Sequence, residues 1–139
     1  MPDPFDLQRF IDAQAPVYGA VRAELKAGRK QSHWMWFVFP QIAGLGSSPT
    51  AVRYAISSLA EARAYLAHPL LGERLRECAG LVLAVEGRSA LQIFGSIDAT
   101  KLRSCLTLFG AAAPDEPLFG DCLRKYFDGE RDPATLAKL

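Results

Sequence analysis

The segment PLLGERLRECAGLVLAV, residues 69–85, shows which kind of fold this chain adopts. Its apolar side chains recur at steps of four and three residues, the period of an α-helix that buries one face. These apolar positions are Leu71, Leu75, Cys78, Val82 and Val85. Glu73, Arg76 and Glu77 lie off this stripe, so we expect them in solvent. The pattern predicts a long amphipathic helix over residues 69–85.

The same helical period recurs on both sides of this segment. Residues suited to begin a helix precede the apolar stretches: Asp6, Pro16, Ser48, Pro49, Ser58, Ser89, Asp98 and Asp132. Gly28 and Gly129 are placed to end two of the helices. A chain of 139 residues fits one domain. We therefore predict an all-α fold, a single compact domain over residues 1–139 with about six to eight helices and no significant sheet.

Composition and charge exclude several classes of function. Half of the residues are hydrophobic and 22% are charged, which is typical of a folded protein and not of a disordered one. Sixteen Lys and Arg residues against fifteen Asp and Glu residues give a net charge of +1, without a basic block for duplex nucleic acid. The acidic start MPDPFD does not resemble a signal peptide, and no apolar run is long enough to span a membrane. We expect a cytoplasmic protein.

Cysteine and histidine are too sparse to indicate a metal site. Cys78, Cys105 and Cys122 are widely spaced and fall on apolar helical stripes, so we expect them buried as core residues. His33 and His68 lie in different segments, and no HExxH motif or cysteine cluster adds ligands. The sequence therefore predicts neither a metal nor a cofactor.

The segment RKQSHWMWFVFPQ, residues 29–41, concentrates aromatic residues. Its length and composition also suit a buried strand, but no second strand is predicted to pair with it. We therefore expect a short central helix, capped by Ser32 and ended near Pro40. Met35 and residues 37–39 are expected in the core.

The polar edge of the same segment is the first candidate for a binding site. An indole such as that of Trp34 or Trp36 often lines a pocket wall and can stack on a planar ligand, although it can equally serve the core. His33 could act as an acid or a base near neutral pH, or could be a hydrogen-bonded turn residue. The nearby GLGSSP, residues 44–49, resembles a phosphate loop, but it lacks the lysine and preceding strand of one, so a turn and helix cap is the simpler interpretation.

Four stretches of the chain resemble one protein family. They are DPFDLQRFIDAQ, RKQSHWMWFVFPQIAGLG, EARAYLAHPLLGERLREC and IFGSIDATKLRSCLTLF, which are spread over residues 3–109. The chain is similar to the bacterial domain-of-unknown-function family 1810, and this resemblance implies a mainly α-helical single domain with no established activity. Some automated labels in that family name calpastatin, a disordered protease inhibitor. The hydrophobic composition of this chain argues against that function.

Two hypotheses about function follow. The first is a pocket for a small anionic, planar ligand such as a nucleotide or an ADP-ribose derivative, with hydrolysis left open. His33 would be the catalytic acid or base of such a reaction. The predicted ligand-binding residues are Lys30, Ser32, Trp34, Trp36, Gln41, His68, Arg74 and Lys101. The second hypothesis is a non-catalytic module that binds another protein through an aromatic patch. The sequence does not decide whether the protein is an enzyme.

Overall fold

The structure is a computed structural model that describes residues 2–139, and this part of the chain forms ten helices. The six longer helices are α1 (Gln8–Gln14), α2 (Tyr18–Lys26), α5 (Leu59–Ala67), α6 (Leu71–Ala84), α8 (Ser96–Ala112) and α9 (Pro117–Phe127). The short helices are α3 (Met35–Val38), α4 (Pro49–Arg53), α7 (Ala90–Phe94) and α10 (Pro133–Leu136). Between residues 2 and 139 the extended backbone pairs only at an isolated parallel bridge, Ile42 with Ile56. The predicted all-α fold is confirmed.

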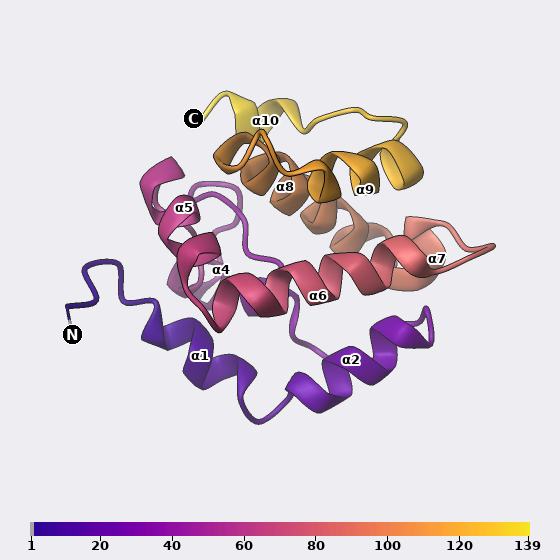
Figure 1. Cartoon of the computed structure of the whole chain (residues 1–139), viewed down its shortest axis with the longest axis horizontal. Coiled ribbons are helices and arrows are strands. Elements are labelled where there is room, and N and C mark those ends of the chain that lie inside the picture. The colour runs from indigo at the N-terminus through magenta and orange to yellow at the C-terminus, as the bar shows by residue number, and fades with distance from the viewer. Residues whose placement is uncertain (1) are drawn as a thin grey trace.

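The helices pack on both sides of α6. Figure 1 shows α6 crossing the middle of the molecule, with α1 and α2 on one side of it and α8, α9 and α10 on the other. Helix α8 packs against α5, α7, α9 and α10, and α9 also packs against α6. Six consecutive residues of α8, 104–109, are all buried. A helix buried on every side is the centre of a core, so α8 is the central helix of this domain.

The segment 29–41 therefore has a smaller role in the fold than the sequence predicts. Only residues 35–38 are helical, which is a single turn, and the helix begins without a side-chain cap. The Ser32 hydroxyl instead donates to the carboxylate of Glu24 in α2. The predicted cap at Ser32 is wrong because this acceptor in α2 holds the serine away from the start of α3.

Most of the predicted helix starts are confirmed. Four side chains accept the expected backbone amide three residues further on: Ser48, Ser58, Ser89 and Asp132. Asp6, Pro16 and Asp98 differ from the prediction. Pro16 precedes Val17, the N-cap of α2, and so lies outside that helix. Asp6 has a positive φ of 51°, and Asp3 accepts the amides of Leu7 and Gln8 in its place. Asp98 lies within the first turn of α8, whose N-cap is Gly95, and is free to bind cations.

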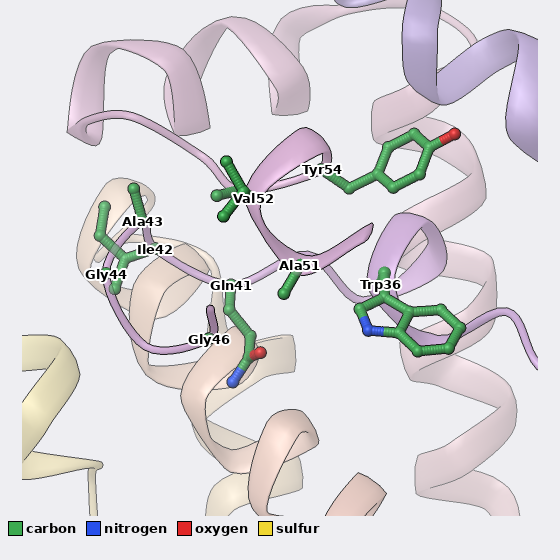
Figure 2. A pocket seen from close by; sticks show the side chains of 10 residues that line it. Trp36, Gln41, Ile42, Ala43, Gly44, Gly46, Ala51, Val52 and Tyr54 are labelled. Carbon is green, nitrogen blue, oxygen red and sulfur yellow. The ribbon is translucent and has the colours of Figure 1, made fainter. Parts of the chain in front are cut away.

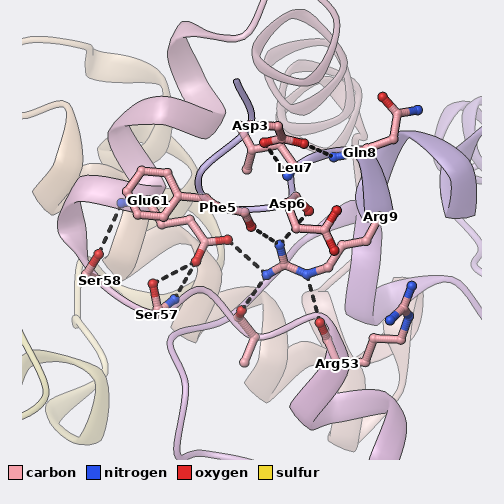
Figure 3. A network of polar contacts seen from close by, with 11 residues as sticks. Asp3, Phe5, Asp6, Leu7, Gln8, Arg9, Arg53, Ser57, Ser58 and Glu61 are labelled. Carbon is pink, nitrogen blue, oxygen red and sulfur yellow. Dashed lines mark hydrogen bonds and ion pairs between the residues drawn. The ribbon is translucent and has the colours of Figure 1, made fainter. Parts of the chain in front are cut away.

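A buried ion pair joins α1 to the start of α5. Arg9 Nη2 lies 2.9 Å from Glu61 Oε2, and these side chains are only 10% and 3% exposed. The Arg9 guanidinium also donates to four backbone carbonyls, those of Phe5, Asp6, Arg53 and Ala55. Glu61 Oε1 accepts from the amide and hydroxyl of Ser57. Figure 3 shows the guanidinium at the centre of these contacts, where it fastens the N-terminal segment to residues 53–61.

The three cysteines are buried free thiols, as predicted. Burial raises the pKa of Cys78 and of Cys122 to about 12, and it raises the pKa of Cys105 well above its ordinary value. These thiols are therefore protonated core residues at neutral pH. No helix within residues 2–139 has both the length and the apolar character needed to cross a membrane.

Candidate functional site

A cavity of about 550 Å³ opens beside Trp36, and we call it the Trp36 hollow. Its walls come from α3, from the loop before α4, from the first half of α8 and from the start of α10. Its lining includes Trp36, Gln41, Lys101, Ser104 and Asp132. A neighbouring depression of about 320 Å³ shares Trp36 with the hollow and is also lined by Lys30 and His33. Trp36 therefore stands between two concave surfaces.

The short helix α3 explains why Trp36 faces this space. Met35 and Val38 are buried in the core and Phe37 packs against it, whereas the half-buried Trp36 lines the hollow. The Nζ of Lys101 lies 4.7 Å from the centroid of the Trp36 ring, within the range of a cation–π contact. Among residues 2–139, no hydrogen-bond acceptor is in reach of the indole N–H of Trp36. The indole thus presents an aromatic surface and an unpaired donor.

Gln41 adds an amide to the same space. Its backbone is fixed, because its carbonyl accepts from Ile56 N at 2.8 Å. Its side-chain amide has no hydrogen-bond partner within the described chain. Figure 2 shows the side chains of Trp36, Gln41 and Ala51 directed toward a common space, a smaller adjoining cavity of about 90 Å³ that these residues also line. A primary amide offers both donors and an acceptor to a ligand.

Two lysines approach this region, but only one is available to a ligand. Lys30 Nζ lies 2.9 Å from Asp98 Oδ2 and donates to the Ser32 carbonyl at 2.6 Å, and its side chain is 8% exposed. Lys101 Nζ lies 3.8 Å from Asp98 Oδ1 and its side chain is 22% exposed. The longer distance means that Asp98 holds Lys101 weakly. Lys101 is therefore the cation of the Trp36 hollow, and Lys30 is mainly structural.

Asp132, for which the sequence predicts only a capping role, supplies a carboxylate on the α10 side of the hollow. Its Oδ2 accepts from Ser104 Oγ at 3.0 Å, from Thr135 N at 3.1 Å and from Thr135 Oγ1 at 2.6 Å. Burial acts to raise the pKa of Asp132, but the hydrogen bonds from Thr135 and Ser104 outweigh it, and the net pKa is lowered. The carboxylate is thus ionised at neutral pH. Ser104 lies on α8, 28 residues before Asp132, so no local sequence pattern links the two residues.

The structure assigns Trp34 and Ser32 to the fold. Trp34 is 1% exposed, and its indole N–H donates to Glu24 Oε1 at 3.1 Å. The same carboxylate accepts from the amides of Gln31 and Ser32. Burial acts to raise the pKa of Glu24, but these hydrogen bonds lower it to about 2. A stacking role for Trp34 is therefore wrong, because the core covers the ring, and Ser32 belongs to the Glu24 contact.

His68 and Arg74 lie away from the Trp36 hollow. His68 Nδ1 accepts from the amides of Leu70 and Leu71 and so caps the start of α6. The Arg74 guanidinium covers the Tyr18 ring at 4.6 Å and donates to Gln14. These two residues contact other helices instead of the hollow, so the fold does not bring them to Trp36, and their ligand-binding roles stay predictions.

His33 is exposed and lines the neighbouring depression, not the Trp36 hollow itself. Its catalytic role stays a prediction. Between residues 2 and 139 the fold brings together no group of three or more His, Cys, Asp or Glu side chains able to hold a metal ion. The side chains that the Trp36 hollow offers to a ligand include one indole, one amide, one lysine and one carboxylate.

The comparisons with known proteins agree with this description of the fold. The family described as "Protein of unknown function (DUF1810)" matches residues 4–139. The chain belongs to this family. A crystal structure of the conserved hypothetical protein Rv1873 from Mycobacterium tuberculosis is similar, with 60% identity and a TM-score of 0.98. The similarity covers 99% of this chain and 98% of that one. No curated protein matches the chain, and neither description above names an activity.

Proposed function

We propose that the protein binds a small planar molecule with an anionic group in the Trp36 hollow. The observation that carries this proposal is the half-buried Trp36 ring with Lys101 Nζ at 4.7 Å, both facing a cavity of about 550 Å³. Ligand sites in proteins have volumes of roughly 300–1,000 Å³, so the hollow is large enough for a nucleotide-sized molecule.

The contacts of each side chain define how such a ligand would lie. A planar ring stacked on the Trp36 indole would gain roughly 1–3 kcal/mol, the range found for bases on aromatic side chains. The Gln41 amide could then pair with a donor and an acceptor on the edge of the ring. Lys101 would exchange its 3.8 Å contact with Asp98 for an anionic group of the ligand. The unpaired Gln41 amide would thus gain partners, and Lys101 would gain a closer anion.

A protein-binding patch at Trp36 has less support. A protein interface of this kind needs a broad apolar surface, whereas the indole lies in a cavity where Gln41, Lys101 and Asp132 interrupt the apolar lining. The strongly exposed Ile97 is an apolar residue on its rim. We assign no catalytic step, because His33 lies in the neighbouring depression. We place the binding in the cytoplasm, since three free thiols fit a reducing compartment.

A thermal-shift panel tests the proposal. The panel contains nucleoside monophosphates and diphosphates, ADP-ribose, and planar carboxylates without a sugar. A ligand at 100 times its dissociation constant should stabilise the protein by about 2.7 kcal/mol. We expect at least one compound to raise the Tm of the wild type and to lose its effect on Trp36→Leu.

Two lysine variants give the matched control. Lys101→Gln should weaken binding of the same compound, and Lys26→Gln, at an exposed position in the last turn of α2, should not. The absence of any shift across the panel would contradict the proposal. Equal binding by wild type and Trp36→Leu would also contradict it, because the ligand would then lie elsewhere.

A further inference from the structure

We infer that Asp132 accepts hydrogen bonds from sugar hydroxyls of the ligand, and that the ligand is therefore a ribonucleotide. This inference rests on the proposed function and goes further, because it names the class of molecule. The Trp36 hollow presents an aromatic surface, a cation on α8 and a carboxylate at the start of α10, and the base, the phosphate and the ribose of a nucleotide match these three features.

The two oxygens of Asp132 have different surroundings. Oδ2 accepts three hydrogen bonds, from Ser104 and from the amide and hydroxyl of Thr135. Within the described part of the chain no group donates to Oδ1. Asp132 lines the hollow, so the fold fixes one oxygen and leaves the other to a ligand.

The backbone around Asp132 is also held in place. Its amide donates to Thr107 Oγ1 at 2.9 Å, and Arg103 donates to the carbonyls of Glu130 and Arg131 at 2.8 and 2.9 Å. These contacts tie residues 130–132 to the central helix α8. The carboxylate is thus oriented before any ligand arrives, and preorganised groups lose less entropy on binding.

The charge of Asp132 limits what it can bind. Its pKa is lowered, so the group is an ionised carboxylate at neutral pH and accepts hydrogen bonds without donating them. The matching ligand group must therefore donate. The two adjacent hydroxyls of a ribose are such donors, and carboxylates bind ribose hydroxyls in dinucleotide-binding proteins.

Lys101 adds a second constraint on the ligand, through its charge. It lies on α8 three residues before Ser104, which holds Asp132. The anionic part of a ligand would approach Lys101 and avoid Asp132, whereas uncharged hydroxyls can meet Asp132 without repulsion. A planar carboxylate without a sugar satisfies Lys101 alone. A ribonucleoside phosphate satisfies both groups.

The test compares ribonucleotides with their 2′-deoxy forms. Dissociation constants are measured by Trp36 fluorescence for AMP, GMP, CMP and UMP and for the four 2′-deoxy counterparts. A hydrogen bond to a charged group is strong enough that losing one hydroxyl should weaken binding roughly ten-fold. We therefore expect the ratio of the two dissociation constants, deoxynucleotide over ribonucleotide, to be about ten for the ribonucleotide that the wild type binds most tightly.

Two variants separate recognition from folding. Asp132→Asn keeps a residue suited to cap α10 but removes the charge, and should bring the ratio close to one. Thr135→Val removes a donor to Oδ2 without touching Oδ1, and should keep the ratio. If Asp132→Asn fails to fold, the ratio of the wild type decides.

The remaining outcomes overturn the inference. Equal affinity of the wild type for the ribonucleotide and the deoxynucleotide would overturn the inference and leave the proposed function intact. Binding of planar carboxylates without binding of any nucleotide would have the same consequence. Tryptamine, a planar molecule with an amine and no phosphate, is measured alongside the nucleotides. Tighter binding of tryptamine than of any ribonucleotide would also overturn the inference, because Asp132 would then be the counter-ion of an amine. Loss of binding across the whole panel would contradict the proposed function itself.

Discussion

Two groups of polar side chains in this molecule differ in how completely they are paired. At Arg9, all five guanidinium N–H groups have acceptors, four of them backbone carbonyls and one the carboxylate of Glu61. At the Trp36 hollow, the indole N–H, the Gln41 amide and Asp132 Oδ1 have no protein partner within residues 2–139. The polar groups at Arg9 are fully hydrogen-bonded within the protein. Those at the Trp36 hollow remain available to solvent or to a ligand.

The contrast separates structural from functional residues better than residue type does. Trp34 and Trp36 are two positions apart, yet the first donates to Glu24 in the core and the second faces a cavity. Lys30 and Lys101 both contact Asp98, yet only Lys101 is held loosely. Substitutions in the paired group should therefore affect stability, and substitutions in the unpaired group should affect binding.

The largest effect on stability is expected at the buried ion pair. Glu61→Ala would leave the Arg9 charge buried without its partner, which typically costs about 3–5 kcal/mol. Urea unfolding monitored by circular dichroism measures this loss. The matched control is Arg22→Ala, which breaks an exposed ion pair with Glu77 and should cost less than about 1 kcal/mol. Similar losses for the two variants would show that burial does not distinguish these pairs.

A smaller loss is expected at Glu24, together with a change in pH dependence. Glu24→Gln removes the charge that accepts from Gln31, Ser32 and Trp34, at a cost of about 1–2 kcal/mol.

The folded pKa of Glu24, about 2, is below its ordinary value of 4.5. The contribution of the Glu24 carboxylate to the free energy of unfolding is therefore complete above pH 4.5 and is lost as the pH falls toward 2. Unfolding free energies of the wild type and Glu24→Gln should converge over that range. A constant difference between them from pH 6 to pH 2 would contradict the assignment.

His68 should contribute about 1 kcal/mol as a helix cap. His68→Ala removes the Nδ1 atom that accepts from Leu70 and Leu71, whereas His68→Asn provides a side-chain oxygen that can replace it. The Tm should be highest for the wild type, intermediate for the Asn variant and lowest for the Ala variant. Ligand binding should be unchanged in all three proteins. A loss of ligand binding in His68→Ala would contradict this assignment and show that His68 has a role in ligand binding.

The smallest effect on stability is expected for Lys101→Gln. The weak contact with Asp98 and the contact with the Trp36 ring together should contribute less than about 1 kcal/mol. A change in affinity without a comparable change in Tm is the expected result. A destabilisation as large as that of Glu61→Ala would place Lys101 among the structural residues.

The local parts of this fold could be predicted from sequence, because they depend on neighbouring residues. The apolar stripe of α6 and the caps at Ser48, Ser58 and Ser89 each involve groups within a few residues of one another. The size of α3 could not be predicted, because Glu24 in another helix holds Ser32 and Trp34.

The candidate site was predictable only in part for the same reason. Trp36, Gln41 and Lys101 were predicted as ligand-binding residues and do line one hollow. His68 and Arg74 carry suitable chemistry but are used by nearby helices. Asp132 read as a simple helix cap, since its contact with Ser104 spans 28 residues of sequence. Which polar groups remain unpaired depends on tertiary packing.

The two tryptophans allow one measurement to test the central claim directly. Each has one indole N–H, so a ¹H–¹⁵N spectrum of the protein should show two indole signals. The signal that is missing in Trp36→Phe belongs to Trp36. On titration with the tightest nucleotide of the panel, we predict that the Trp36 signal shifts in a saturable manner and that the Trp34 signal, bonded to Glu24, stays in place. A saturable shift of the Trp34 signal with no change at Trp36 would contradict the account.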